Sequence, residues 1–455
     1  MSPLKRFLTF ALPMGCKALG TQPDTAAPLP QECCKAIHDL LPSIVHGIGT
    51  EEYNGRLGTY YSYQQHALSP ACVVKPTSAN DVSRILRIAS LQDCAFAVAS
   101  GGHMAWPESS NTGDGFLFDL RDLNQIDISL KDQTISLGPG SKWTSVYAAM
   151  SVHNVTTAGA RVNDVGVGGF LLGGGVAYMS NTHGFGSNTV FNYEVVLSDG
   201  TIINANSTSH ADLFWALRLA GTNYGIVTRF DMPIFPSPAI WGAVTLYPAT
   251  EQSTSEIFAD YEKYNRDNDN VDTFKSAVFV NMPGQNDMMM TVIVNSAGQR
   301  EPPMTSVDHI QQAEKLGSTH IVVSDVMTAL LEAPVRTAWF TMTTRVNRQL
   351  FLDLNKMLAD VFQPFEGKSG LSLAMGYQAF QKSYIEATHD SPVYNSMKEA
   401  DDDLTLILLM VTWKDPKDDK EMKKATARFG KLAEQEATKR NLFSNFIYLN
   451  YANGC

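Results

Sequence analysis

Two glycine-rich stretches decide the fold of this chain: Ser100-Gly-Gly-His103 and Gly166-Val-Gly-Gly-Phe-Leu-Leu-Gly-Gly-Gly175. Runs of this kind are costly inside a helix or strand, because glycine loses more backbone freedom on folding than any other residue. We therefore expect two glycine-rich turns, at 100–102 and 166–175. Successive backbone N–H groups in such turns form concavities that bind anions, and two turns in one domain favour a dinucleotide ligand.

Short strands and helices alternate around these turns. Val82, Ile85, Leu86 and Ala89 recur at helical spacing after Ser78 or Asn80, residue types that cap helices. Apolar and alternating runs predict the other elements: strands at 73–76, 95–98 (buried), 116–120, 126–130, 134–137, 190–197 and 201–204, with helices at 143–150 and 212–220.

Three prolines, Pro233, Pro236 and Pro238, end this alternation, and we place a domain boundary there. The second half contains further strand-like runs at 277–281, 290–294 and 404–413. A charged helix is expected over 417–440.

The composition excludes several classes of protein. The 455 residues include 35 Lys plus Arg and 46 Asp plus Glu, giving a net charge of −11, with 44% hydrophobic and 18% charged residues. These values indicate two or three globular domains with a sizeable core rather than a disordered chain. The excess of acidic over basic residues argues against a nucleic-acid partner. No apolar run reaches the ~18 residues of a membrane span.

The N-terminus and the cysteines bear on the cellular compartment. A basic start and the apolar run Phe7–Leu12 resemble a secretory signal peptide over residues 1–20, against the alternative of a disordered leader. Cys33, Cys34, Cys72 and Cys94 then remain before the second glycine stretch. Four cysteines allow three sets of disulfides, and the set with a bond between the neighbours Cys33 and Cys34 is strained. Two sets of disulfide pairings therefore stay open. No CxxC pair occurs, so no metal site is expected.

Other nucleotide and hydrolase motifs do not fit. In a Rossmann GxGxxG read from Gly166, Leu171 stands where the third glycine is due. P-loop, HExxH and GxSxG patterns are absent from the sequence. His103 follows the first glycine turn directly, at the mouth of the expected cofactor site.

The ordered motifs at 100–103, 166–175 and Gly221-Thr-Asn-Tyr-Gly-Ile-Val-Thr228 resemble FAD-linked oxidases of the vanillyl-alcohol-oxidase superfamily. The most similar group is the berberine-bridge-enzyme-like oxidases in a fungal-type variant. The resemblance implies an α+β fold: a PCMH-type FAD-binding domain of two subdomains at 30–237, and an α/β substrate domain with an antiparallel sheet at 238–440. Residues 441–455 would begin a return to the FAD domain.

The resemblance also implies a cofactor site for FAD. His103 matches the histidine that is covalently joined to the flavin, and Val162 replaces the cysteine of bicovalent relatives, which implies a single link. Val165 would lie near the flavin position that reacts with dioxygen, and Ile226 near the adenine side. The full set implied for the cofactor is Ser100, Gly101, Gly102, His103, Val165, Gly166, Gly169, Gly174, Gly175 and Ile226.

Two residues are candidates for catalysis. Tyr451, in Asn450-Tyr-Ala-Asn453, matches a family motif whose tyrosine accepts a proton from substrate while hydride leaves to the flavin. A buried strand tyrosine is an equal alternative. His183 lies where relatives have a tyrosine and would face substrate or, in the slightly favoured alternative, merely pack.

We therefore expect an FAD-dependent oxidase acting on a small organic molecule and dioxygen, in secondary-metabolite biosynthesis and in the secretory pathway. A carbohydrate oxidase is the alternative within enzymes. Because relatives continue for several tens of residues beyond this motif, a truncated chain is also expected, and an extended form should hold FAD better. The other alternative is a degenerate, non-redox flavin-binding or secreted protein. The sequence leaves the oligomeric state open.

Overall fold

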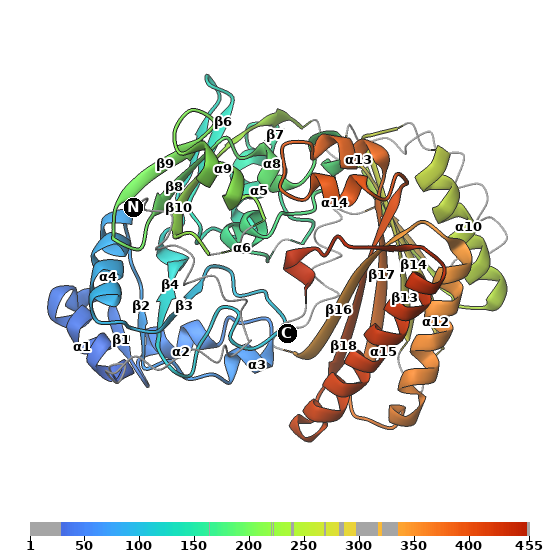
Figure 1. Cartoon of the computed structure of the whole chain (residues 1–455), viewed down its shortest axis with the longest axis horizontal. Coiled ribbons are helices and arrows are strands. Elements are labelled where there is room, and N and C mark those ends of the chain that lie inside the picture. The colour runs from blue at the N-terminus through green and yellow to red at the C-terminus, as the bar shows by residue number, and fades with distance from the viewer. Residues whose placement is uncertain are drawn as a thin grey trace.

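The computed structural model describes residues 29–162, 164–219, 221, 223–237, 241–267, 270–281, 286–296, 317–320 and 335–452. The expected leader at 1–20, Asn453 and Cys455 lie outside these residues. Figure 1 shows two lobes side by side. One lobe carries the small sheets of the N-terminal half. The other contains a large sheet whose far side is covered by helices.

The first small sheet has the strand order β1-β2-β4-β3, with β4 parallel to both β2 and β3. Ser78 caps α4 as expected, since its Oγ accepts a hydrogen bond from the N–H of Asp81 at 3.2 Å. The edge strand β3 is less buried than expected, because Phe96 is 39% exposed. The strands are β1 (Val45–Gly47), β2 (Cys72–Val74), β3 (Phe96–Ala99) and β4 (Phe116–Asp119), and the helices are α1 (Pro30–Leu40), α2 (Glu51–Leu57), α3 (Tyr63–His66) and α4 (Ala79–Leu91).

Two disulfides connect α1 to this sheet. Cys33 is bonded to Cys94 and Cys34 to Cys72, which is one of the two pairings left open by the sequence. The bridges span 61 and 38 residues of chain. Crosslinks over loops of this length stabilise a fold mainly by restricting the unfolded chain.

The second small sheet is antiparallel, with the order β5-β6-β10-β8-β9. Four of its strands overlap runs that the sequence pattern predicted, and β6 spans 134–137 as expected. The central strand β10 was not predicted. The strands are β5 (Ile126–Ser129), β6 (Thr134–Leu137), β8 (Asn192–Val196), β9 (Ile202–Asn206) and β10 (Ile226–Pro233), with the separate pair β7 (Val155–Thr156) and β11 (Phe235–Pro236). The helices are α5 (Trp143–Ser151), α6 (Val167–Leu172), α7 (Ser180–His183), α8 (Gly186–Thr189) and α9 (Ala211–Leu217).

The prediction of a turn throughout 166–175 is wrong, because residues Val167–Leu172 form the helix α6. Packing overrides the low helical propensity of glycine here. A Cβ on Gly168 would lie 3.0 Å from the Ser100 hydroxyl and 3.2 Å from the Pro139 side chain. The glycines therefore let this helix approach the first glycine turn, which is a reason for their clustering that spacing alone does not reveal.

The large sheet has eight strands in the order β15-β12-β14-β13-β17-β18-β16-β19. Every described pairing in it is antiparallel, as in β17 with β18. The strands are β12 (Trp241–Pro248), β13 (Thr273–Asn281), β14 (Met288–Asn295), β15 (Gly317–His320), β16 (Arg336–Arg345), β17 (Ser372–Phe380), β18 (Leu404–Trp413) and β19 (Phe443–Ser444). The helices are α10 (Glu251–Asp267), α12 (Arg348–Phe362), α13 (Lys382–Ala387), α14 (Tyr394–Lys398) and α15 (Asp419–Lys439).

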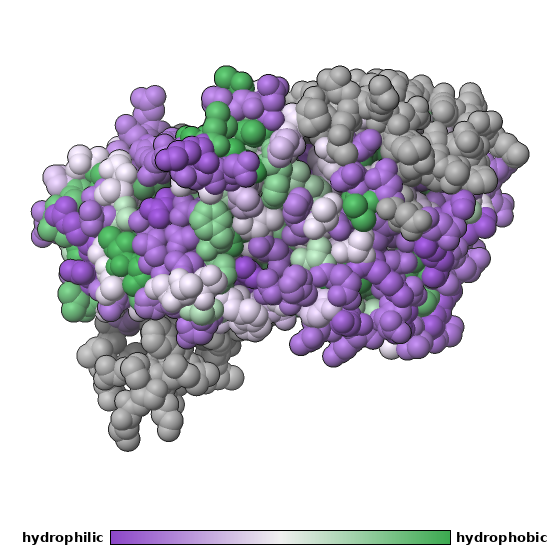
Figure 2. All heavy atoms as spheres, turned by 90° about the horizontal axis from the view of Figure 1, so that it is seen from above, coloured by the Kyte–Doolittle hydropathy of each residue, from purple (hydrophilic) through white to green (hydrophobic). Residues whose placement is uncertain are grey.

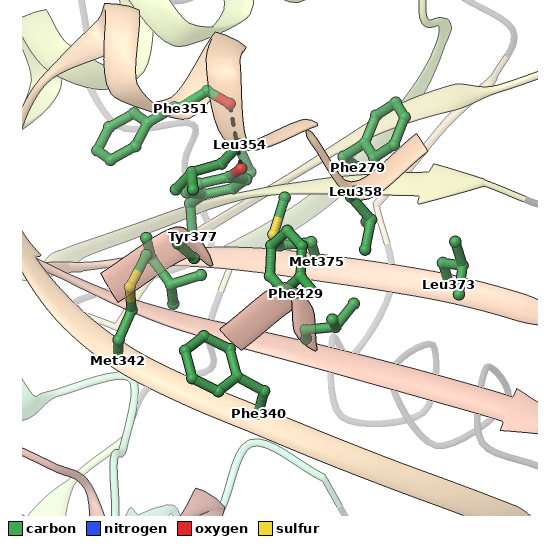
Figure 3. Packing of buried hydrophobic residues seen from close by; sticks show 14 of the residues in the cluster. Phe279, Phe340, Met342, Phe351, Leu354, Leu358, Leu373, Met375, Tyr377 and Phe429 are labelled. Atoms are coloured by element: carbon green, nitrogen blue, oxygen red, sulfur yellow. Dashed lines mark hydrogen bonds between the residues drawn. The ribbon is translucent and has the colours of Figure 1, made fainter. Parts of the chain in front are cut away.

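One face of this sheet packs on the long helices α10, α12 and α15, and Figure 3 shows the centre of that core. Tyr377 on β17 points at α12, where its hydroxyl donates to the Phe351 carbonyl at 3.3 Å. Successive strand residues point to opposite faces. Gln378 therefore faces away from the helices, toward the N-terminal lobe, where it contacts Arg161.

The surface is mostly hydrophilic in the view of Figure 2, with hydrophobic residues in small groups. Among the helices that the structure describes, none combines the length and the apolar character needed to cross a bilayer. The mixed helix-and-sheet architecture with two small sheets and one large antiparallel sheet confirms the expected α+β fold.

Candidate functional site

The two glycine stretches touch each other through their backbones. A Cβ on Gly101 would lie 2.5 Å from the Gly166 nitrogen, and a Cβ on Gly166 would lie 2.4 Å from the Gly101 nitrogen. Real Cβ atoms do not come this close to backbone, so neither position has room for a side chain. The turn after β3 and the start of α6 thus form one continuous glycine surface.

Backbone donors remain unused on this surface. Within the described chain, the N–H groups of Gly101, Gly102 and His103 have no hydrogen-bond acceptor. Gly102 has a φ of +75°, in the left-handed region that favours glycine. Unpaired successive N–H groups at such a bend match the oxygens of a pyrophosphate. The turn therefore fits the phosphate portion of a dinucleotide.

His103 continues this turn and lies against an aromatic ring. Its imidazole stacks on Tyr61 with ring centroids 4.4 Å apart and an angle of 8° between the planes. Burial lowers the pKa of His103 to about 4, and the nearby Asp164 opposes that shift. The imidazole is therefore neutral at pH 7. The His103 side chain is partly accessible to solvent.

A line of aromatic rings leads from His103 to the second lobe. Tyr61 meets Trp339 of β16 edge to face at 5.9 Å, and Trp339 meets Tyr451 in the same way at 5.8 Å. Burial raises the pKa of Tyr61 to about 12, so this phenol stays protonated. The line brings the expected cofactor histidine and the expected catalytic tyrosine, which are far apart in sequence, into one region.

Tyr451 belongs to a hydrogen-bonded cluster with Arg161. The Nη2 group of Arg161 donates to the Tyr451 hydroxyl at 2.9 Å and to the Gln378 side-chain oxygen at 2.6 Å. The Arg161 guanidinium also lies 5.0 Å above the Phe274 ring. Tyr178 donates to the Arg161 carbonyl at 3.3 Å, which fixes the backbone below the side chain.

His183 has different surroundings. Its ring stacks on Phe235 with centroids 4.2 Å apart, and burial lowers its pKa while Asp272 opposes the shift. Among the described contacts, none connects His183 with Tyr451 or Arg161. The role of His183, facing substrate or packing, stays a prediction.

The remaining expected cofactor residues lie around α6. Val165 accepts a hydrogen bond from the Trp143 N–H at 3.0 Å, and Gly169 is exposed on the helix. Gly174 and Gly175 have φ values of +109° and +87°. The N–H of Gly175 donates to the Tyr448 hydroxyl at 3.1 Å, which connects this segment to the C-terminal part of the described chain.

Ile226 is buried at the start of β10 and pairs with Val196 of β8. It lies in the apolar cluster between the two small sheets rather than beside Tyr451.

Sequence reasoning missed the residues that surround Tyr451 and His103. Gln378 stood out as a polar residue in the apolar stretch 372–380, and Arg161 as a cation between Gly159 and Gly166. Neither feature of the sequence indicates which side chain Gln378 or Arg161 contacts. Trp339 gave no signal, because its strand reads as ordinary core.

Comparison with known proteins agrees with this geometry. Residues 70–206 match the family model described as an FAD binding domain. The chain is 32% identical over 317 residues to the FAD-dependent monooxygenase FUP4 of Fusarium proliferatum, an alignment that covers 67% of this chain and 60% of FUP4. It is 28% identical to the FAD-dependent monooxygenase tpcD of Cochliobolus heterostrophus, over 86% of this chain and 79% of tpcD.

Solved structures share the fold over nearly the whole chain. The 6-hydroxy-D-nicotine oxidase of Arthrobacter nicotinovorans superposes with a TM-score of 0.72 at 18% identity, covering 95% of this chain and 91% of that one. Berberine bridge enzyme superposes with a TM-score of 0.73 at 14% identity, covering 94% and 88%.

Residues 70–206 therefore belong to an FAD binding domain. The fold of the chain is that of the berberine-bridge-enzyme-like oxidases, as the sequence motifs implied. The alignment with FUP4 spans less than two thirds of that relative's length.

Proposed function

We propose that this protein is an FAD-dependent oxidase that removes a hydride from a C–H bond next to oxygen or nitrogen in a small organic molecule. Residues 30–237 form the FAD domain and 238–440 the substrate domain in this proposal, and residues 441–455 begin a return to the FAD domain. The carrying observation is the aromatic line that joins His103 to Tyr451, because it puts a cofactor-side histidine and a hydrogen-bonded phenol in one region.

The unused N–H groups at 101–103 would hold the FAD pyrophosphate, helped by the glycine surface at Gly166. FAD supplies a hydride acceptor at its N5 atom, and its two electrons reduce dioxygen to hydrogen peroxide. The other expected cofactor residues, Ser100, Val165, Gly169, Gly174, Gly175 and Ile226, would shape the surrounding shell.

His103 would also bind FAD covalently. A neutral imidazole offers a free lone pair, and burial keeps His103 neutral at physiological pH by lowering its pKa to about 4. Tyr61 holds the ring in a fixed plane by stacking on it. A bond from this nitrogen to the flavin 8α carbon would replace a C–H bond of the methyl group and the imidazole N–H, and the two protons and two electrons released would reduce dioxygen to hydrogen peroxide. That bond would prevent loss of the cofactor. The absence of a cysteine at Val162 supports a single link.

Tyr451 would act as the base that takes the substrate hydroxyl proton while the hydride leaves from the same carbon. The phenolate form of Tyr451 would take the proton and become neutral. Arg161 donates to the Tyr451 oxygen at 2.9 Å, so the guanidinium charge would stabilise that phenolate before the transfer. Gln378 holds the same guanidinium from the other lobe and so fixes its direction. His183 packs against Phe235 and takes no part in this step.

The relatives FUP4 and tpcD, both named FAD-dependent monooxygenases of fungi, support a natural-product intermediate as substrate. Carbohydrate oxidation is the second candidate. Its support is the Asn450-Tyr-Ala sequence together with the fold shared with a xylooligosaccharide oxidase, at a TM-score of 0.73 and 16% identity.

The two disulfides are consistent with an oxidising compartment, and we propose that the protein is secreted. Mass spectrometry of the protein from the medium of a eukaryotic host tests this. A mature N-terminus near residue 20 supports secretion, whereas full retention inside the cell contradicts it.

Fluorescence of a denaturing gel under ultraviolet light tests the covalent FAD. The wild-type protein should give a fluorescent band at its full mass, and His103→Ala should give none. His153→Ala is the matched control, because His153 is an exposed histidine outside this region. Fluorescence that survives in His103→Ala would reject the attachment site. A wild-type protein that binds no FAD, even after reconstitution, would support the degenerate alternative.

Peroxide release separates the substrate classes. The purified protein is offered phenolic and benzylic alcohols, amines, and oligosaccharides with reducing ends, and peroxide is counted against product. One peroxide per product from an alcohol or amine supports the proposal. Turnover of the oligosaccharides alone would favour the carbohydrate oxidase.

A further inference from the structure

Arg56 is a fully buried arginine directly beneath the first glycine turn. Its side chain is 0% exposed, and its Nε and Nη2 groups have no hydrogen-bond partner in the described structure. Its guanidinium lies 4.4 Å from the centre of the Tyr60 ring. A buried charge with unused donors costs stability, because each unsatisfied group has lost its hydrogen bonds to water. We therefore looked for a function that would explain a charged guanidinium at this buried position.

The single described hydrogen bond of the Arg56 side chain goes to the glycine turn. Its Nη1 group donates to the Ser100 carbonyl at 3.1 Å. A Cβ on Gly102 would lie 2.8 Å from the Nη2 atom, so the guanidinium lies against the turn itself. The unused N–H groups of Gly101, Gly102 and His103 belong to the same bend.

The charge around Arg56 is not balanced. Asp119 is the nearest carboxylate, with 3.7 Å between Nη1 and Oδ1. That carboxylate is hydrogen-bonded instead by Arg121, whose Nε and Nη2 groups donate to it at 2.9 and 2.7 Å. Two arginines thus share one carboxylate, and the trio carries one formal positive charge beneath the turn.

The bond to Ser100 transmits this charge to the turn. The Ser100 carbonyl and the Gly101 N–H belong to one peptide group. A cation that binds the carbonyl oxygen polarises that group and strengthens its N–H as a donor, since linked hydrogen bonds reinforce one another. Low polarity around a fully buried guanidinium increases the effect.

We propose that Arg56 is a positioning residue for the FAD pyrophosphate: it polarises the Ser100–Gly101 peptide and supplies positive charge behind the turn without touching solvent. This inference rests on the proposed function, since it requires that the turn binds a diphosphate. Nothing in it depends on the chemistry at Tyr451 or on the covalent link.

Binding of ADP and AMP to protein expressed under riboflavin limitation, so that no FAD is attached, tests the role, because ADP carries a diphosphate and AMP does not. We expect Arg56→Met to weaken ADP binding at least tenfold and AMP binding by much less. Arg56→Lys, which keeps the charge, should restore part of the ADP affinity. Circular dichroism and a thermal melt establish that each variant is folded.

Two further variants keep the test decisive if Arg56→Met fails to fold. Asp119→Asn leaves Arg56 in place and removes the counter-charge, so ADP should bind more tightly. Arg121→Gln frees Asp119 to neutralise Arg56, so ADP should bind more weakly and with less dependence on salt. A purely structural Arg56 predicts equal ADP affinity in every folded variant, and that result would overturn the inference.

The outcomes also separate this inference from the proposed function. If wild-type protein binds neither ADP nor FAD, the cofactor assignment itself fails. If wild-type protein binds both and the charge variants leave ADP affinity unchanged, the cofactor assignment stands and the role of Arg56 is rejected.

Discussion

Arg161 donates a hydrogen bond to the hydroxyl of Tyr451 across 2.9 Å and 290 residues of sequence. The arginine lies between the two glycine-rich stretches of the N-terminal lobe, and the tyrosine lies in the last described turn of the chain. The contact therefore depends on the docking of both lobes. It gives the proposed base a neighbouring cation that a phenol packed only for stability would not need.

Removing either partner should slow flavin reduction measured anaerobically by stopped flow. We expect a loss of about 10²–10⁴-fold for Tyr451→Phe, the range usual for a general base. Arg161→Met should cause a smaller loss, and the double variant should be no slower than Tyr451→Phe, because Arg161 acts through the phenol.

Arg84→Met is the matched control for this cycle, since Arg84 is exposed on α4 and should leave reduction unchanged. Additive losses in the double variant would show that Arg161 acts independently of Tyr451.

His183→Ala should change stability rather than chemistry. The ring stacks on Phe235 at 4.2 Å, and an aromatic pair of this kind contributes about 0.5–1.5 kcal/mol. We expect a lower melting temperature with an unchanged rate of flavin reduction. A normal melting temperature with a rate reduced tenfold or more would instead assign His183 to the reaction.

Gly101→Ala should damage both the fold and the cofactor site. The new Cβ would lie 2.5 Å from the Gly166 nitrogen, and overpacking typically costs about 1–3 kcal/mol. We expect a lower melting temperature and loss of bound flavin. Gly47→Ala is the control, because nothing lies within 4 Å of a Cβ there. Equal flavin content in the two variants would contradict a close contact between the glycine stretches.

Local patterns predicted the elements well where one face of an element is buried. The strand β6 and the strand β18 begin and end as the apolar pattern indicated, and Ser78 caps its helix. The pattern failed at α6, because the reason for its glycines is contact with a turn over sixty residues earlier in the chain.

The candidate site was predictable only in part. His103 and Tyr451 were recognisable from neighbouring motif residues. Trp339, Arg161 and Gln378 were not, since their roles depend on which side chains meet across the two lobes. Arg56 was equally hidden, because a lone arginine in a short helix carries no sign of burial.

The stability of flavin-free protein should depend on pH through His103. Its pKa is about 4 in the folded chain, lowered mainly by burial, against an ordinary value of 6.5. Between these values the unfolded chain binds the proton and the folded chain does not. Stability should therefore fall as the pH drops from 6.5 toward 4, and this contribution should level off below pH 4.

Urea unfolding from pH 7.5 to 3.5 measures this dependence. The wild-type protein and His103→Gln should differ most in slope between pH 6.5 and 4, with the variant less sensitive to acid. Other groups titrate in both proteins, so the difference isolates the imidazole. His153→Gln, at an exposed histidine, should follow the wild type. Parallel curves for wild type and His103→Gln would mean that the imidazole accepts its proton near the ordinary pH in the folded protein, so that burial does not lower the pKa of His103.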